Sequence, residues 1–217
     1  MLSFRVNKIR CHPARSRKIS AAITVSFILI TGCINKTFNT EQELWNYIKN
    51  EENGYIQHKN INGYDFTLLY KPTDLLVKQE LSDLKNAKKI SALRKKYNQY
   101  MYFNLSMSKN NKELLSMAPH NRNEFGAMVN QLAFGMGNKV HLYTQKKDTL
   151  PLLDFVYPRM YGMSQSTDIL FVYPRDKKYL KNEYLNFTVE DLGIYIGEVK
   201  FKLSVDKIKN EPVLTFK

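Results

Sequence analysis

Residues 55–70 read YIQHKNINGYDFTLLY, and this stretch does most to decide the fold. Asn62 and Gly63 stand between two runs that are typical of β-strands. An Asn-Gly pair tolerates the positive φ angles that a two-residue type I′ turn requires. The sequence therefore predicts a β-hairpin with one strand over 55–61 and the other over 64–70.

A helix is predicted on the amino-terminal side of this hairpin. Thr40 to Glu43 has the form of a capping box, with Thr at the N-cap and Glu three residues later. Leu44, Tyr47 and Ile48 then share one helical face, and Gly54 is a suitable stop. These features place a helix near 41–52.

Further helices are expected after the hairpin. Pro72 ends the second strand, and Thr73-Asp74 can cap a helix that contains Leu76, Leu81 and Leu84. Ile90, Leu93 and Tyr97 follow at helical spacing, and residues 101–107 suit a strand. Residues 121–124 resemble the start of another helix, and Gly135-Met136-Gly137 would end that helix. The clearest amphipathic stripe in the chain belongs to this last helix and consists of Phe125, Met128, Val129 and Leu132.

From Lys139 onward the sequence is typical of strands, which we predict at 139–145, 149–157, 167–174, 184–189 and 194–205. The predicted fold class is therefore α+β, with helices mostly in the first two thirds and an antiparallel β-sheet in the last third.

The amino terminus has the features of an export signal. Of the formal net charge of +13, six units come from the first 32 residues, which contain no acid, and this leaves +7 for the rest. Residues 21–30 read AAITVSFILI, an apolar stretch well short of the ~20 residues that a transmembrane helix needs. A basic region followed by a short apolar one is the pattern of a secretory signal.

Ile30-Thr31-Gly32-Cys33 follows this apolar stretch and resembles the lipobox of bacterial lipoproteins. The resemblance implies cleavage before Cys33 and a diacylglycerol thioether on its sulfur. It also implies a membrane anchor, since two acyl chains suffice for stable attachment. Neither an Asp after Cys33 nor an acidic cluster is present, which by the same resemblance favours the periplasmic face of the outer membrane.

These features divide the chain into a signal peptide over 1–32, a lipidated tether over 33–39 and a single α+β domain over 40–217. Cys11 and Cys33 are the two cysteines, so the mature chain would have no partner for an internal disulfide. An uncleaved anchor or a buried amino-terminal strand is the alternative interpretation of the first residues.

A basic cluster without an intervening acid is expected on the helix that contains Ile90. Such a face suits phosphorylated head groups or an acidic partner, and a solvated helix face is the plainer interpretation. The charge excess lacks a nucleic-acid-binding motif, so nucleic acid is not an expected partner. The cluster consists of Lys85, Lys88, Lys89, Arg94, Lys95 and Lys96.

The sequence FVYPR occurs twice, at 155–159 and 171–175. The simple explanation of this repeat is that two strands each end at a proline. A sharper hypothesis makes Tyr157, Arg159, Tyr173 and Arg175 interface contacts, since Tyr and Arg are enriched at binding hot spots. If the two strands form a hairpin, the two Tyr-Pro-Arg ends lie at opposite edges.

No catalytic motif is recognisable. The chain lacks a nucleophile elbow, a phosphate-binding loop and a dinucleotide fingerprint. His58, His120 and His141 have no neighbour at metal-ligand spacing, so no metal and no cofactor is expected.

The leading functional hypothesis is an envelope lipoprotein that acts as a non-enzymatic binding or assembly module, whose partner is an envelope protein or an anionic lipid or glycan. The body of the chain also resembles uncharacterised small lipoproteins of Gram-negative bacteria. An envelope hydrolase with a dispersed active site is the alternative. A basic cytosolic protein is a third interpretation, which requires that the first 32 residues are not a signal.

Overall fold

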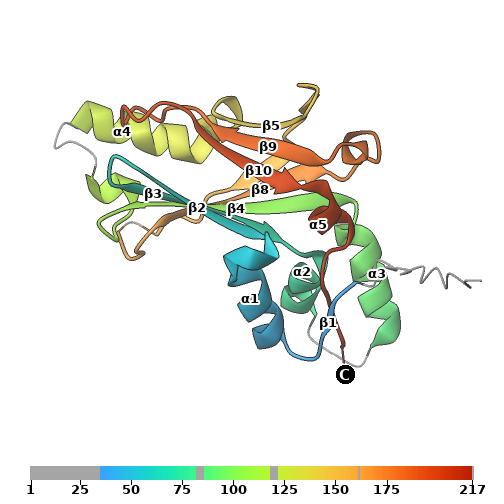
Figure 1. Cartoon of the computed structure of the whole chain (residues 1–217). Helices are drawn as coiled ribbons and strands as arrows, with labels where there is room; N and C mark the ends of the chain where they lie inside the picture. The colour runs from blue at the N-terminus through green and yellow to red at the C-terminus, as the bar shows by residue number, and fades with distance from the viewer. Residues whose placement is uncertain (1–34, 82–85, 118–121, 161, 217) are drawn as a thin grey trace, which may run out of the picture. The chain divides into compact units, whose positions relative to one another are not determined.

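Two β-sheets pack face to face and enclose most of the core (Figure 1). The computed structural model describes residues 35–81, 86–117, 122–160 and 162–216, all within the compact unit Cys33–Lys217. The larger sheet has, in spatial order, β2 (Ile56–Ile61), β3 (Tyr64–Lys71), β4 (Tyr100–Lys109), β8 (Thr167–Pro174) and β7 (Asp154–Val156). The smaller sheet has β10 (Val199–Ser204), β9 (Tyr184–Val189), β5 (Val140–Thr144) and β6 (Thr149–Leu150).

The hairpin predicted from residues 55–70 is confirmed. Ile61 pairs with Tyr64, so the connection is the two-residue turn Asn62-Gly63. Asn62 has a φ of 52° and Gly63 a φ of 78°, the positive values that a type I′ turn needs. This turn sets the register between β2 and β3.

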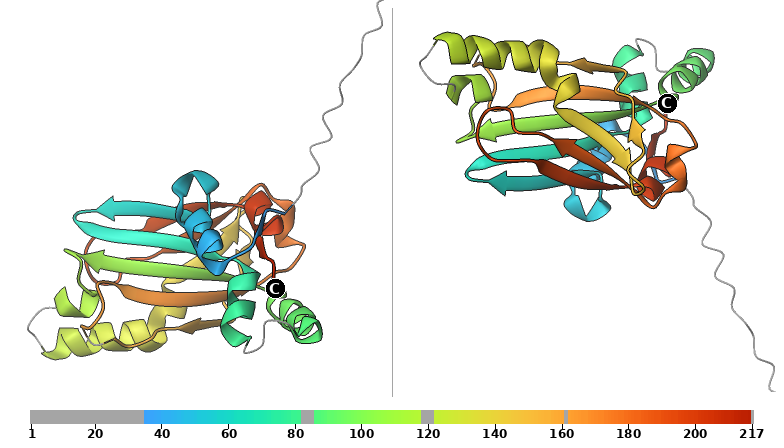
Figure 2. Two further views of the ribbon diagram at one scale, coloured as in Figure 1. Left: turned by 90° about the horizontal axis from the view of Figure 1, so that it is seen from below. Right: turned by 90° about the horizontal axis from the view of Figure 1, so that it is seen from above.

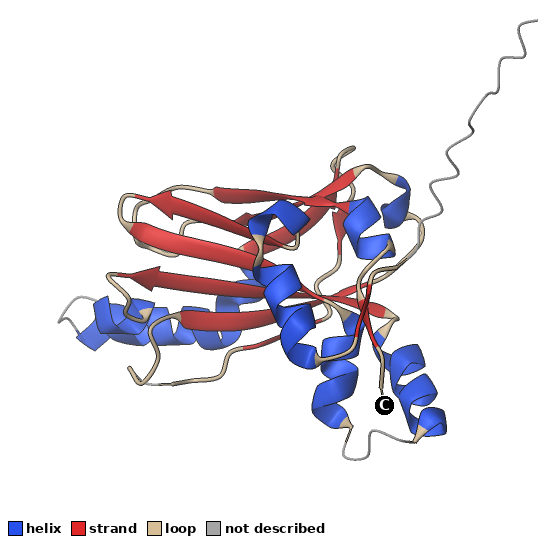
Figure 3. Cartoon of the chain, turned by 60° about the horizontal axis from the view of Figure 1, so that its bottom comes forward, coloured by secondary structure: helices blue, strands red, loops and turns tan. Residues whose placement is uncertain are grey.

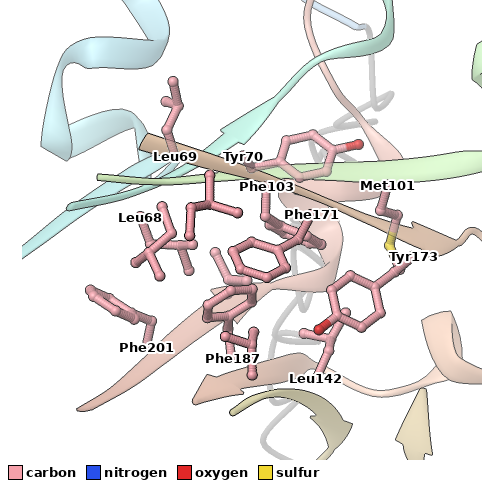
Figure 4. Packing of buried hydrophobic residues seen from close by; sticks show 14 of the residues in the cluster. Leu68, Leu69, Tyr70, Met101, Phe103, Leu142, Phe171, Tyr173, Phe187 and Phe201 are labelled. Atoms are coloured by element: carbon pink, nitrogen blue, oxygen red, sulfur yellow. The ribbon is translucent and has the colours of Figure 1, made fainter. Parts of the chain in front are cut away.

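Alternating side chains build the interface between the sheets. Every second residue of β8 is buried, and β10 shows the same alternation, because successive side chains of a strand point to opposite faces. The ring of Phe187 in β9 lies 5.8 Å from Phe103 in β4 and 5.7 Å from Phe171 in β8. These centroid distances are typical of packed aromatic pairs, and Figure 4 shows the rings gathered between the sheets.

Gln57 joins the two sheets at one edge. It lies in edge strand β2, and its side-chain Nε2 donates a hydrogen bond of 2.7 Å to the backbone oxygen of Lys202 in edge strand β10. Its Oε1 accepts from the Lys202 backbone nitrogen at 3.4 Å. One amide side chain thus takes the place of a neighbouring strand and satisfies edge groups that would otherwise be open to pairing.

Helices lie at one end and along one side of the sheets. The view from below shows α1 across the outer face of the larger sheet (Figure 2). The capping box predicted for α1 is confirmed, since Thr40 accepts from the Glu43 backbone and the Glu43 side chain accepts from Thr40. The helices are α1 (Glu41–Lys49), α2 (Thr73–Glu80), α3 (Ala87–Tyr97), α4 (Arg122–Asn130) and α5 (Val205–Lys209).

Short helical turns complete the described residues. The 3-10 turns are Glu51–Asn53, Leu114–Met117, Met136–Asn138 and Tyr179–Lys181, and a π-helical turn at Gln131–Gly135 continues α4. Near the two ends of the described residues, β1 (Thr37–Phe38) and β11 (Val213–Leu214) form a short parallel pair. β11 contacts both α1 and α2 (Figure 3).

The predicted distribution of helices and strands along the chain is wrong. Three strands of the larger sheet, β2, β3 and β4, come from the first half of the chain, and helices and strands alternate throughout. Pairing of β4 with β8 joins Phe103 to Phe171 and merges early and late strands into one sheet. Local sequence patterns predict individual strands, but they do not specify which distant strand is the neighbour.

Several element predictions also need correction. No α4 side chain is fully buried, and Phe125 is 43% exposed. Met128 and Val129 are partly buried against the core, and the turns after α4 enter it through Leu132 and Met136. The predicted strand 149–157 is two short strands separated around Pro151, whose missing N–H interrupts a ladder. The predicted strand 194–205 begins only at Val199, since residues 191–197 form a loop around Asp191.

Candidate functional site

A cleft of about 780 Å³ opens at the end of the sheets where β3 and β8 finish and β4 begins. Residues from the start of α2, the end of α3, the segment after β8 and the carboxy-terminal segment line it. The volume falls in the usual range for small-molecule sites. The cleft is therefore the first candidate for a binding site.

Glu211 organises the floor of the cleft. This carboxylate is 7% exposed and accepts hydrogen bonds from the Tyr70 hydroxyl at 2.7 Å and from the Thr73 hydroxyl at 2.7 Å. It also accepts from the Thr73 backbone nitrogen at 3.2 Å and forms an ion pair with Arg175 at 2.9 Å. Its acceptor positions are thus occupied by the protein itself.

Arg175 fills the space beside Glu211. Its Nη2 donates to the Tyr70 hydroxyl at 2.5 Å and to the Ile208 backbone oxygen at 2.8 Å. Its Nη1 donates to Glu211 and Asn98. Its Nε is buried without a hydrogen-bond partner among the described residues. Arg175 therefore serves mainly to hold the carboxy-terminal segment against β3 and α3.

The same contacts shift two pKa values. Burial and the neighbouring Glu211 carboxylate raise the pKa of Tyr70 well above its ordinary range, so the hydroxyl stays protonated. Burial acts to lower the pKa of Arg175, but Tyr70 and Glu211 outweigh burial and raise it. Neither group is prepared to exchange a proton near neutral pH.

Asp74 and Arg94 form a second ion pair in the cleft wall, between a buried carboxylate and a partly exposed guanidinium. Arg94 donates to the two Asp74 carboxylate oxygens at 2.8 Å and 2.6 Å, and the Asp74 side chain is 3% exposed. Asp74 also accepts from the backbone nitrogen of Leu214 at 2.7 Å. The fork of the guanidinium matches the carboxylate, so α2, α3 and β11 are joined at one point.

Four more cations surround the cleft without an acidic partner. Lys95, Lys177, Lys181 and Lys209 line it and are exposed, and none forms an ion pair within the described part of the chain. Because the two acids of the cleft are each paired with an arginine, the lysine charges remain uncompensated. The cleft attracts anions.

The lining offers little for acid–base catalysis. Both carboxylates are saturated by donors, and neither histidine that the structure describes lines the cleft. His58 Nδ1 lies 2.7 Å from the Thr67 hydroxyl, and His141 Nε2 lies 3.0 Å from a Glu190 oxygen. His120 falls outside the described residues. Across the described ranges, no group of three or more His, Cys, Asp or Glu residues can hold a metal.

The structure divides the basic cluster predicted on α3. Arg94 and Lys95 line the cleft, whereas Lys96 forms an exposed ion pair of 2.9 Å with Glu80. Lys88 and Lys89 are exposed away from the cleft lining, and Lys85 lies outside the described residues. The cluster is therefore not one continuous face.

The two FVYPR sequences have different surroundings. β7 and β8 pair antiparallel, with Phe155 opposite Phe171, so the two Tyr-Pro-Arg ends point to opposite ends of the sheet. Arg175 is buried in the cleft, while Arg159 is exposed and lies over the Phe134 ring at 5.6 Å. Tyr173 is fully buried, and Tyr157 is half-buried. The four residues do not form one surface.

The segment after Cys33 lies beside the cleft. Cys33 itself is outside the described residues, but Asn35 lines the cleft. The Lys36 oxygen accepts from Val213 at 2.9 Å, and the Phe38 oxygen accepts from Thr215 at 2.8 Å. The described part of the segment predicted as a tether is thus fixed to β11.

Sequence reasoning missed most of the cleft. Glu211, Lys177, Lys181 and Lys209 were not singled out. Asp74 was named only as part of a helix cap, which is wrong because Pro72 is the N-cap of α2 and no side chain caps it. Glu211 is 138 residues from Thr73 and 141 from Tyr70, so no local spacing indicates their contact. The available signal was weaker: an arginine after a strand-ending proline, at Pro174-Arg175.

Comparisons with known proteins add little. Neither a protein-family model nor a curated protein matches the sequence. A crystal structure of a protein of unknown function from Burkholderia pseudomallei is similar over 76% of this chain and 86% of that chain, with 11% sequence identity and a TM-score of 0.37. Among the described residues, no helix is long and apolar enough to cross a membrane.

Proposed function

We propose that this protein is a lipoprotein of the bacterial cell envelope, anchored through a lipid on Cys33, and that its domain is a non-enzymatic module that binds an anionic ligand in the cleft. The observation that supports binding is the set of four unpaired lysines around a cleft whose two acids are both neutralised. We place the protein at the periplasmic face of the outer membrane, in keeping with the residues after Cys33.

The cleft chemistry favours binding over hydrolysis. A hydrolase with a dispersed site needs a nucleophile or a base whose lone pair is available to the substrate. Glu211 and Asp74 are the acids of the cleft, and each is fully engaged by protein donors. A bound anion would instead meet ammonium groups, which orient and hold it without reacting.

The experiment that tests the anchor is the mass of the amino-terminal peptide of protein purified from its own membranes. The expected peptide begins at an acylated Cys33. Cys33→Ser should lose the lipid and leave unprocessed precursor, because only a thiol can form the thioether. Normal processing and membrane retention of the Ser variant would contradict the lipid anchor. An unmodified peptide that begins near Met1 would contradict it too, and would favour a cytosolic protein.

A further inference from the structure

We infer that the ligand of the cleft is the phosphodiester head group of an anionic phospholipid, taken from the same bilayer that holds the acyl chains on Cys33. This inference deepens the proposed function and rests on its lipid anchor. It identifies both the ligand class and the side of the domain that faces the membrane.

The first support is the short distance between the anchor and the cleft. Asn35 lines the cleft and is two residues from Cys33. Two residues span at most about 7 Å. The head-group region on each side of a bilayer is roughly 5–8 Å thick. A lipid on Cys33 therefore holds the rim of the cleft within the head groups.

The second support is that no flexible linker separates the segment after Asn35 from the domain. Backbone hydrogen bonds of Lys36 to Val213 and of Phe38 to Thr215 fix the segment after Asn35 along β11. Val213 itself lines the cleft. The lipid would consequently hold the domain through a strand pair of which Val213 lines the cleft.

The third support is the distribution of charge. Lys95, Lys177, Lys181 and Lys209 come from three separate segments and lie around one opening. Clusters of four or more basic residues beside a membrane anchor are attracted to anionic lipid surfaces. Lysine is suited to such contacts because its ammonium binds phosphate as a mobile point charge.

The fourth support separates a lipid from a free phosphate. Leu180, Pro212 and Val213 line the cleft beside the cations. An inorganic anion gains nothing from these apolar side chains, whereas the glycerol backbone and first methylenes of a phospholipid are removed from water against them. The combination of cations and apolar walls therefore favours a lipid.

The test uses the mature protein purified from its own membranes in a nonionic detergent. Dihexanoyl phosphatidylglycerol is titrated, with dihexanoyl phosphatidylcholine and inorganic phosphate as comparison ligands, and binding is measured by calorimetry and by the shift in melting temperature. We expect saturable binding of the phosphatidylglycerol, with the other two bound at least about tenfold more weakly.

Matched variants locate the binding site. Lys177→Gln/Lys181→Gln removes two charges from the cleft, and Lys146→Gln/Lys147→Gln removes two from an exposed turn elsewhere. The cleft variant should bind phosphatidylglycerol at least about tenfold more weakly than the parent protein does. The turn variant should bind it with the parent's affinity. Circular dichroism and the melting temperature without ligand show whether each double variant folds. If a double variant does not fold, the two single variants are measured instead.

Three results would overturn the inference. Equal affinity for the two lipids would mean that the cleft does not distinguish an anionic head group from a zwitterionic one. Equal affinity for phosphate and phosphatidylglycerol would assign the site to a free anion. Equal weakening by both variant pairs would show diffuse attraction instead of a site. Each result leaves the acylated amino-terminal peptide unchanged, so failure here differs from failure of the proposed anchor.

Discussion

At the scale of single residues, Glu211 holds the carboxy-terminal segment in place. Its carboxylate is nearly buried and compensates the charge of Arg175, whose side chain is 11% exposed. Removal of one partner of a buried pair leaves the other charge without compensation, and this is more damaging than loss of the pair as a whole. Glu211 therefore has a structural importance that its place near the end of the chain does not suggest.

Glu211→Gln should lower the free energy of unfolding by about 3 kcal/mol, because the amide keeps the shape of the side chain but leaves the buried guanidinium unpaired. Urea unfolding followed by circular dichroism measures the change. Glu80→Gln is the control, since Glu80 belongs to an exposed pair with Lys96 and should leave the midpoint unchanged. Similar losses for both variants would show that the Glu211 pair is not buried in solution.

A second acid organises a loop. Asp191 accepts hydrogen bonds from the backbone nitrogens of five residues, 193 to 197, and the loop carries Tyr195 at its tip, 92% exposed. Partial burial acts to raise the pKa of Asp191, but the backbone donors, Gly197 and Gly193 foremost, outweigh it and lower the pKa. The charged carboxylate is thus the form that the loop requires.

Asp191→Asn should therefore reduce stability at neutral pH by roughly 1 kcal/mol, as loss of a cap does. A lowered folded-state pKa gives stability that is present above the unfolded pKa and lost as pH falls below about 4. The difference between parent and variant should shrink over that range in urea unfolding at several pH values. Glu198→Gln, in the same hairpin, is the control; an unchanged difference at low pH would contradict the role of the charge.

At the scale of elements, the pairing of β1 with β11 is the contact on which the position of the cleft depends. It consists of few hydrogen bonds, among them Val213 to Lys36 and Thr215 to Phe38. The pair packs against two helices, since β11 contacts both α1 and α2. A pair of this length has little stability alone and depends on those neighbours.

Val213→Pro should open this pair, because proline lacks the N–H that binds the Lys36 oxygen. The readout is the rate at which trypsin, cutting after Lys36, releases the domain from membranes. Loss of one hydrogen bond, about 1 kcal/mol, predicts roughly fivefold faster release. Val213→Ala keeps the N–H and should change the rate little; an unaltered rate in the proline variant would show that the pair does not protect Lys36.

The predictions that are confirmed have local causes, whereas contacts between distant residues were not predicted. The Asn62-Gly63 turn and the Thr40 capping box depend on neighbours within a few residues, and both are confirmed. The pairing of β4 with β8 and the contact of Glu211 with Thr73 join residues 60 or more positions apart. Periodicity and turn chemistry depend on residues close in sequence and give no information about such contacts. This explains why the strands were assigned to the wrong part of the chain and most of the cleft was missed.

At the scale of the whole domain, the sheets separate two ends. The cleft and Asn35 lie where β3 and β8 finish. The turn Asn62-Gly63 and the start of β8 lie at the other end of the same strands. With eight residues in β3 and in β8, at about 3.3 Å each, the two ends are roughly 26 Å apart.

The proposed anchor predicts which end meets the bilayer. The mature chain would have no cysteine besides Cys33, so a single introduced cysteine can be labelled with a fluorophore. In vesicles that contain a lipid-borne quencher, a label at Lys178→Cys, near the cleft, should be quenched strongly. A label at Gln165→Cys, just before β8, should not. Equal quenching, or the reverse order, would contradict the orientation.

The pairing of β1 with β11 also has a consequence for the order of folding. Residues 36 and 213 are separated by most of the chain, and closing so long a loop is slow and unfavourable until the rest of the structure pays back the entropy. The hairpin of β2 and β3 can form as soon as it emerges, whereas the cleft needs Glu211, Leu214 and Arg175 together. The cleft is therefore among the last parts to assemble, and a chain that lacks its carboxy-terminal segment has no complete cleft.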